Sequence, residues 1–456
     1  MKFINRESEI KRLKNAIESP IAKLVVIYGR RRCGKSTLIR NIFKKADIYF
    51  MAQQADESVQ RIQLAKVIGE KIVGFDKLIY PDWESLFLNL NNTLKENISL
   101  CLDEFPYLVK SSSIFPSLIQ KITDDPNGRK YHLILCGSSQ QMMHGLVLDS
   151  TSPLYGRADE ILNIQPIKPA WIIEALDCTP LQAVQEYSVW GGVPRYWELR
   201  KEKESFEAAL KSIVFDRLGV LHEEPARLFL DDMRESVQAF SILSIVGMGS
   251  NRISEIAARL NKPVTQLSRP IDNLINLGYL KREIPYGGSL KTGKKSIYRI
   301  SDPFMNFYFS FVSPNLSRLQ SGLIDQVYES SSIGLIHFFA KEWENLCRIC
   351  IPFLPVEGIN FDLPSRWWGN NVRGEQMELD LVCESTDKKW VLIGECKWSR
   401  VSDPTSIFVE LEKKAELLPF IKDKKIITVL FVKELSLTDK KNPRIFTPEE
   451  VLSRLK

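Results

Sequence analysis

The sequence contains 456 residues, of which 44% are hydrophobic and 26% charged, and its formal net charge is +6. This composition is ordinary for a folded globular protein, and the length exceeds what a single hydrophobic core supports, so we expect several domains. No apolar run approaches the roughly 20 residues that span a bilayer, and the N-terminus lacks the apolar core of a signal peptide. We therefore expect a cytoplasmic protein with no membrane partner.

The eight cysteines are scattered, and we expect them to be reduced. Cys347 and Cys350 form a lone C-x-x-C. No second cysteine or histidine pair stands near it at zinc spacing, so we interpret these residues as two small apolar side chains on a helix.

Strand-like and helix-like segments alternate from residue 3 to about residue 165. This alternation predicts a parallel sheet with helices on its faces. The strands are expected at 24–28, 48–51, 98–102, 132–136 and 160–164, with helices between them, for example at 59–73 and 83–97.

A glycine-rich loop follows the first of these strands, and a helix-like segment begins directly after it. The loop reads Gly-x-x-x-x-Gly-Lys-Ser, which is the spacing of a phosphate-binding loop. Its two glycines let the backbone wrap closely around phosphates, and its N–H groups together with the helix N-terminus attract anions. Lys35 can reach the β- and γ-phosphates, and the Ser36 hydroxyl can ligate Mg²⁺. The predicted nucleotide site comprises Gly29, Arg30, Arg31, Arg32, Cys33, Gly34, Lys35, Ser36 and Thr37.

Two acids stand at the end of the expected strand 98–102. Both should lie at the carboxyl edge of the sheet, where ligands of parallel sheets bind. We assign Asp103 to Mg²⁺, directly or through water. Glu104 is the candidate base that polarises the attacking water.

Further side chains are candidates for contact with the nucleotide. The strand 132–136 is followed by Ser138 and Ser139, and either one could contact the γ-phosphate or orient the attacking water. Arg157 could be an arginine finger, in cis or offered to a neighbouring subunit, or an ordinary surface arginine. Arg195 could sense the nucleotide from the helical region that follows the sheet.

These motifs, in this order, resemble the archaeal-type ATPases of the P-loop class, which are AAA-related, STAND-like proteins of archaea and bacteria. The resemblance implies that ATP is the nucleotide, that Asn5, Arg6 and Glu7 lie near the adenine, and that a helical lid carries the Gly-Gly-x-Pro element at 191–194. Cys33 stands where relatives usually have another small or apolar residue. The resemblance rests on residues 3–13, 28–38, 102–108, 135–139, 152–157 and 190–197.

A helix, a turn, a second helix and a two-stranded ribbon are expected between residues 235 and 302. This order is typical of a winged helix-turn-helix. We predict contact with nucleic acid, DNA in preference to RNA, with the helix 264–277 in the major groove. The alternative is a protein-interaction or inter-domain module. The segment is strongly basic, with Arg252, Arg259, Lys262, Arg269, Lys281, Arg282, Lys291, Lys294, Lys295 and Arg299.

The C-terminal region contains two strand-like segments joined by a polar hairpin, at 376–383 and 390–398. Because residues two apart in a strand share a face, Glu395 and Lys397 should point the same way, with Asp380 opposite them on the paired strand. Two carboxylates could hold Mg²⁺ or Mn²⁺ while the lysine steadies the attacking water. Glu344, from an upstream helix, could complete the metal site. An ordinary charged hairpin is the alternative.

This constellation resembles the restriction-endonuclease-like PD-(D/E)xK superfamily, although Leu379 replaces the proline of the motif. It is also similar to the domain of unknown function that accompanies archaeal-type ATPases. A nuclease-like fold that only binds nucleic acid stays open.

The predicted fold is therefore an α/β protein that combines a P-loop NTPase sheet, a helical lid, a winged helix-turn-helix and a restriction-endonuclease-like domain. Its predicted function is ATP hydrolysis coupled to nucleic-acid binding and cleavage. A switch-type ATPase with a recognition module, or a chaperone-like NTPase, is the alternative, and a homo-oligomer or a protein partner stays open. The expected domains are 1–167, 168–234, 235–302 and 331–456, with a linker at 303–330.

Overall fold

The computed structural model describes residues 4–125, 128–147, 149–232, 236–289, 295–421, 424–435 and 442–456. The chain forms two compact units. One comprises Phe3–Pro166 with Leu228–Arg234, and the other comprises Ile167–Arg227 with Glu235–Lys456.

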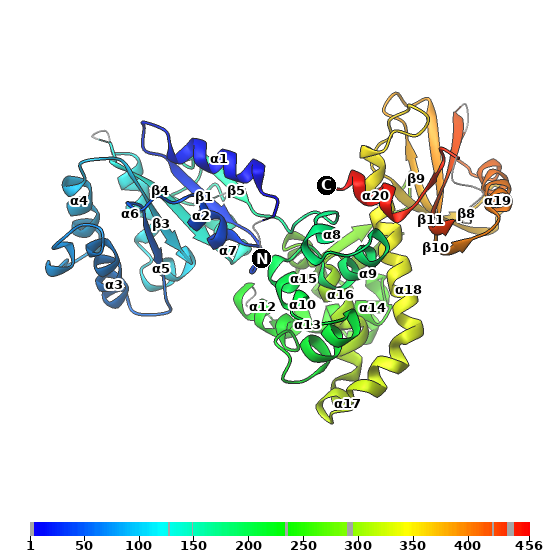
Figure 1. Ribbon diagram of the computed structural model, residues 1–456, viewed down its shortest axis with the longest axis horizontal. Coiled ribbons are helices and arrows are strands. Elements are labelled where there is room, and N and C mark those ends of the chain that lie inside the picture. The colour runs from blue at the N-terminus through cyan, green and yellow to red at the C-terminus, as the bar shows by residue number, and fades with distance from the viewer. Residues whose placement is uncertain are drawn as a thin grey trace. The chain divides into compact units, whose positions relative to one another are not determined.

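The first unit is built on a five-stranded parallel sheet in the order β2-β3-β4-β1-β5 (Figure 1). All five predicted strands are present, and each lies within one or two residues of its expected ends. The central strands β3 and β4 are buried along their whole length, as expected for a sheet covered on both faces. The elements are α1 (Glu7–Ile17), β1 (Leu24–Tyr28), α2 (Lys35–Ile42), β2 (Ile48–Met51), α3 (Glu57–Gly69), η1 (Phe75–Lys77), α4 (Trp83–Thr93), β3 (Ile98–Asp103), α5 (Phe105–Ser111), α6 (Phe115–Thr123), β4 (Tyr131–Gly137), α7 (Gln140–Val147) and β5 (Glu160–Asn163).

The second unit begins with helices, and a short antiparallel hairpin, β6 with β7, follows them. The expected order of helices followed by a two-stranded ribbon is present, and α15 ends one residue before the expected helix end at 277. The elements are α8 (Trp171–Leu176), α9 (Pro180–Trp190), α10 (Pro194–Lys201), α11 (Phe206–Ala209), η2 (Leu210–Phe215), α12 (Glu224–Asp232), α13 (Ser236–Gly247), α14 (Ile253–Leu260), α15 (Val264–Asn276), β6 (Leu280–Glu283) and β7 (Ile297–Ile300). The second part of α12, from Leu228 on, belongs to the first unit.

The segment expected to be a linker, 303–330, is instead helical, and its aromatic side chains are buried. Phe304, Phe307 and Phe309 are fully buried, and the ring of Phe307 stacks on that of Phe215. Burying such large apolar surfaces stabilises the unit, whereas a solvated linker would leave them exposed. The elements are α16 (Pro303–Phe307), η3 (Tyr308–Val312), η4 (Ser313–Asn315), α17 (Leu316–Gln320) and the long helix α18 (Ile324–Cys350).

The C-terminal part is a mixed five-stranded sheet in the order β12-β11-β10-β9-β8, on which α18 packs through β10 (Figure 1). Strand β10 pairs in parallel with β11 and antiparallel with β9. Cys347 and Cys350 are buried on α18, as expected for two small apolar residues. The elements are η5 (Ile351–Phe353), β8 (Ser365–Asn370), β9 (Gln376–Glu384), β10 (Trp390–Val401), α19 (Pro404–Glu416), β11 (Lys425–Leu435), β12 (Ile445–Phe446) and α20 (Pro448–Arg454).

No helix in the described ranges is long and apolar enough to cross a bilayer.

Candidate functional site

The glycine-rich loop connects β1 to α2, and its two glycines adopt conformations that other residues rarely take. Gly29 has φ 143°, and a Cβ there would lie 2.3 Å from the carbonyl oxygen of Ile164. Gly34 caps α2 with φ 89°. The Lys35 ammonium is buried and donates to the carbonyl oxygens of Gly29 at 2.8 Å and Arg30 at 3.1 Å. The lysine thus lies folded against the loop, with weak neutral acceptors that a phosphate could replace.

Ser36, the second residue of α2 after this loop, contacts Asp103 at the end of β3. The Ser36 hydroxyl donates to Asp103 Oδ2 at 2.8 Å, and the Glu104 N–H donates to Oδ1 at 2.9 Å. The hydroxyl of Tyr49, the second residue of β2, also donates to Oδ2, and burial followed by the charge of Asp103 raises the pKa of Tyr49. A hydroxyl and a carboxylate are the oxygen donors that Mg²⁺ prefers, so this pair fits the ion. Tyr49 was not predicted, because its contact depends on β2 and β3 being neighbours.

Glu104 stands at the start of α5 with the positive φ of 52°, a conformation found at functional sites more than elsewhere. Its Oε1 atom accepts a hydrogen bond from the Ser138 hydroxyl at 2.8 Å. Ser139 is buried and its hydroxyl accepts instead from the Met142 N–H at 3.4 Å, within the first turn of α7. The structure therefore links Ser138, and not Ser139, to the candidate base.

Arg6 braces the loop from the N-terminal segment. Its buried guanidinium donates to the carbonyl oxygen of Cys33 at 3.1 Å and to that of Gln165, and it pairs with Glu9 at 2.9 Å. Three separated stretches of chain are thereby joined at the carboxyl edge of the sheet.

Arg157 lies near the amino end of β1, whereas the glycine-rich loop lies at its carboxyl end. Arg157 precedes β5, which runs parallel to β1, and the backbone N–H of Asp159 bonds the carbonyl of Leu24 at the start of β1. The glycine-rich loop begins where β1 ends, so the four residue steps from Leu24 to Tyr28 separate the two by about 13 Å at roughly 3.3 Å per step. The Arg157 guanidinium is also engaged with Asp124 at 2.9 Å. It does not reach the loop of its own chain.

Arg195 belongs to the other unit. It lies on α10, half exposed, with Nη1 3.0 Å from Glu198 Oε2.

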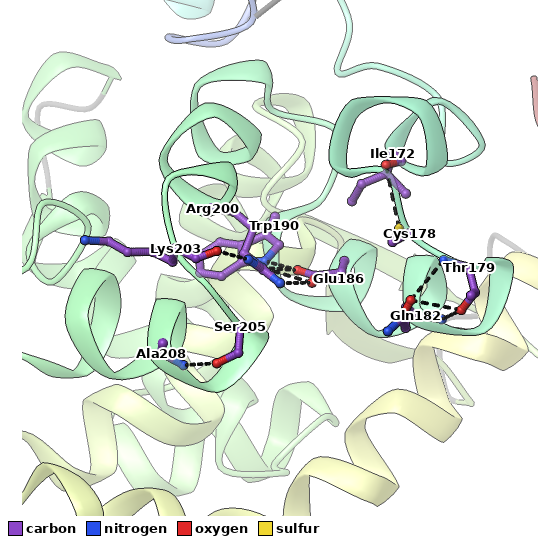
Figure 2. A network of polar contacts seen from close by, with 10 residues as sticks. All are labelled: Ile172, Cys178, Thr179, Gln182, Glu186, Trp190, Arg200, Lys203, Ser205 and Ala208. Carbon is purple, nitrogen blue, oxygen red and sulfur yellow. Dashed lines mark hydrogen bonds and ion pairs between the residues drawn. The ribbon is translucent and has the colours of Figure 1, made fainter.

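The helical region around α9 and α10 is held by an ion pair between the buried Glu186 and the partly buried Arg200 (Figure 2). Both carboxylate oxygens of Glu186 accept from Arg200 Nε, at 2.9 and 3.0 Å, and Oε2 also accepts from the Trp190 indole at 2.7 Å. Burial raises the pKa of Glu186, and the arginine and tryptophan donors oppose this shift. The adjoining Gly192 has no room for a side chain, because a Cβ would lie 2.0 Å from the carbonyl oxygen of Ile167.

The predicted C-terminal residues come together. The β9–β10 ladder pairs Leu381 with Gly394, so Asp380 stands opposite Glu395 one step further along. Glu395 and Lys397 share a face, with Oε1 and Nζ 2.7 Å apart. Burial, followed by the charges of Glu344 and Glu395, raises the pKa of Asp380 to about 6. Asp380 is therefore near enough to both other carboxylates for their charges to disfavour its ionised form.

Several cations, which the sequence did not single out, balance these carboxylates. Lys414 Nζ lies 3.7 Å from Glu395, and Glu344 lies 3.6 Å from Arg348 and 4.0 Å from Arg366. Within the described ranges, no group of three or more His, Cys, Asp or Glu side chains is arranged to hold a metal ion. Two acidic residues, Asp380 and Glu395, are the donors that this site could offer to Mg²⁺ or Mn²⁺.

The loop of the β6–β7 hairpin packs on this C-terminal sheet. The Tyr286 N–H donates to the carbonyl oxygen of Arg366 at 2.8 Å, and its hydroxyl donates to Glu384 Oε1 at 2.7 Å. The rings of Tyr286 and Phe420 are 4.9 Å apart. At Tyr286 the hairpin is therefore occupied by the C-terminal domain and is not free for another partner.

The ten predicted cations of the basic segment fall into separate groups. Three of them contact neighbours within the unit. Lys281 contacts Asn345 and Glu283, Arg282 contacts Ser296, and Arg299 contacts Glu283. Lys291 and Lys294 lie outside the described residues. The exposed members are Arg252, Arg259, Lys262 and Arg269, on or next to α14 and α15, and Lys295 beside β7.

Comparison with known proteins agrees with this architecture. A family described as an ATPase domain predominantly from Archaea matches residues 3–177, and a family of archaeal and bacterial proteins of unknown function matches residues 308–407. An uncharacterized protein of Methanocaldococcus jannaschii is 30% identical over 430 residues, which cover 91% of this chain and 92% of that protein.

Among solved structures, the Walker-type ATPase of Pyrococcus abyssi is similar in fold. Its TM-score is 0.50 at 20% identity, and the match covers 67% of this chain and 96% of that one. The chain therefore belongs to the archaeal-type P-loop ATPases, in the form that also carries a C-terminal domain of unknown function.

Proposed function

We propose that this protein is a Mg²⁺-dependent ATPase whose nucleotide state controls nucleic-acid binding by a winged helix-turn-helix and metal-dependent phosphodiester cleavage by the C-terminal domain. The observation that carries the ATPase part is the hydrogen bond between Ser36 and Asp103 directly below a phosphate-binding loop whose lysine is buried. A lysine, a serine and an aspartate at these positions are suited to bind the phosphates and the metal ion of a nucleoside triphosphate.

In this proposal Lys35 turns from the loop carbonyls to the phosphates, and Ser36 and Asp103 hold the metal ion. Mg²⁺, when bound, would neutralise charge on the phosphates. Glu104 takes the proton of the attacking water, and Ser138 fixes the direction of its carboxylate. Tyr49 keeps the Asp103 carboxylate in place.

Two arginines have more distant roles in the proposal. Arg157 acts on a neighbouring copy of the chain, because a strand length separates it from its own loop. Arg195 senses the nucleotide from the helical lid.

Nucleic acid is proposed to bind at the tip formed by α14 and α15. Arg252, Arg259, Lys262 and Arg269 are exposed there and can contact phosphates, whereas the hairpin is anchored to the C-terminal sheet through Tyr286. Binding of this kind falls steeply with salt, since it releases counterions.

For cleavage, Asp380 and Glu395 are proposed to hold the metal ion, with Glu344 nearby, and Lys397 to steady the attacking water. One observation favours a second candidate, an ATPase switch whose C-terminal domain recognises nucleic acid without cutting it. Glu395 is already paired with both Lys397 and Lys414.

A cleavage assay separates the two candidates. The purified protein is incubated with single- and double-stranded DNA and with RNA, in Mg²⁺ or Mn²⁺, with and without ATP. Cleavage that Asp380→Ala and Lys397→Ala both abolish establishes the nuclease. Salt-sensitive binding without cleavage under any condition establishes the recognition module. Lys35→Ala is the matched control that removes ATP dependence from either activity.

A further inference from the structure

A cavity of about 460 Å³ lies in the second unit, between the end of α13, strand β7, the buried segment α16–η3 and helix α18. This volume is within the usual range for small-molecule sites, about 300–1,000 Å³. Glycines account for part of the hollow. Gly247, Gly249 and Gly334 line it and offer no side chain to fill it.

The cavity wall is closely packed at two of these glycines. A Cβ on Gly247 would lie 2.6 Å from Phe309, and one on Gly334 would lie 3.0 Å from the ring of Phe311. The helices therefore pack closely against the aromatic segment at these two points.

The charge of the lining has one sign. Among the described residues that line the cavity none is acidic, while Arg299, His337 and Lys341 are basic. His337 and Lys341 are four residues apart on α18 and so share one face of the helix. Both are exposed, and within the described part of the chain neither side chain forms a hydrogen bond or an ion pair. An anionic group could accept from both without displacing an existing partner.

The remainder of the lining suits a planar, hydrogen-bonding body. Phe311, Phe338 and Tyr298 contribute buried aromatic surface, and Asn306 and Asn251 contribute amide groups. Aromatic faces stack on nucleobases, and amide side chains bond their edges. Asn251 directly precedes the exposed Arg252, so the cavity adjoins the basic tip of α14.

We propose that this cavity is a second nucleotide site, distinct from the phosphate-binding loop, which takes one nucleotide unit with its phosphate on Lys341 and His337 and its base against the aromatic and amide lining. The nucleotide unit is either a free mononucleotide or one residue of a single strand. This proposal does not depend on ATP hydrolysis or on cleavage.

Titration calorimetry on the full chain tests it. The chain carries Lys35→Ala, so that heat from the phosphate-binding loop is suppressed, and the probes are AMP, inorganic phosphate and a short oligothymidylate. AMP or the oligonucleotide should bind saturably, and inorganic phosphate at least about tenfold more weakly. Lys341→Ala should weaken binding about tenfold or more, as loss of a charge-assisted hydrogen bond does.

Two further variants sharpen the result. Asn306→Ala should weaken nucleotide binding and leave the weak phosphate binding unchanged, because it touches only the base side. Lys413→Ala removes an exposed lysine of α19, away from the cavity, and should change nothing. Saturable binding of AMP, of the oligonucleotide or of both supports the site if Lys341→Ala weakens it. The proposal is overturned if neither binds, if Lys341→Ala has no effect, or if phosphate binds as tightly as AMP.

Discussion

Replacing Asp380 with Asn should stabilise the protein in the absence of metal ions. Asp380 is a buried carboxylate beside Glu344 and Glu395, and together these causes raise its pKa from 3.8 to about 6. That shift corresponds to at most about 3 kcal/mol, at roughly 1.36 kcal/mol per pKa unit. The Asn side chain keeps an oxygen that can accept the Cys396 N–H, which now donates to Asp380 Oδ2 at 2.9 Å.

The sign of the pH dependence follows from the raised pKa. Between pH 3.8 and 6 the folded state binds more protons at this site than the unfolded state. The free energy of unfolding therefore falls as the pH rises through that window, and the full loss from ionising Asp380 is reached above it. The stabilising effect of Asp380→Asn should therefore be full at pH 8 and absent near pH 4.

The assay is thermal unfolding of both proteins in EDTA across this pH range. At the lower end of the usual 2–4 °C per kcal/mol for large domains, the increase in Tm at pH 8 is up to about 6 °C. Glu378→Gln is the control, because that acid is on the same strand, exposed, and paired with Arg366 at 3.6 Å. An exposed pair contributes at most about 1 kcal/mol. A lower or unchanged Tm for Asp380→Asn at pH 8 would refute the convergence of the three carboxylates.

Three other substitutions test separate parts of the structure. Ser138→Ala should lower kcat for ATP hydrolysis roughly tenfold with little change in KM, because Glu104 loses its orienting donor while the nucleotide contacts stay; equal kcat would argue against that role. Arg200→Met should cost about 3–5 kcal/mol in urea unfolding by leaving Glu186 buried and unpaired, and the loss should be larger at pH 8 than at pH 5, since the raised pKa penalises the charged form. Tyr286→Phe should leave folding intact and increase hydrogen exchange in the hairpin, whereas unchanged exchange would mean that its hydroxyl does not hold the hairpin.

Local patterns were sufficient to predict the ATPase sheet. Strand β1, the glycine-rich loop and the acidic end of β3 are each specified by neighbouring residues, so apolar runs and glycine spacing are enough. Arg6, Tyr49 and Tyr286 were not predicted as contacts, because each meets a partner far away in sequence whose position depends on strand order or domain packing.

The segment 303–330 shows a different source of error. Its position between two predicted domains favoured a linker, yet its phenylalanines are apolar surface that the fold has to bury. Arg157 illustrates the same dependence on topology. A motif can place an arginine before a strand, but only the parallel pairing of β5 with β1 decides at which end of the strands it lies.

Helix α18 has a consequence for how such proteins can change over time. It is continuous for 27 residues, about 40 Å at 1.5 Å per residue, and runs from the buried aromatic segment to the C-terminal sheet. A gene fusion that joined a new C-terminal domain at residue 331 would cut this helix after about two turns and remove the residues that Tyr286 contacts. The β6–β7 hairpin and the C-terminal sheet that it contacts should therefore be inherited and exchanged as a pair, while the ATPase unit, whose main segment ends before the helical region begins, is the natural place for recombination.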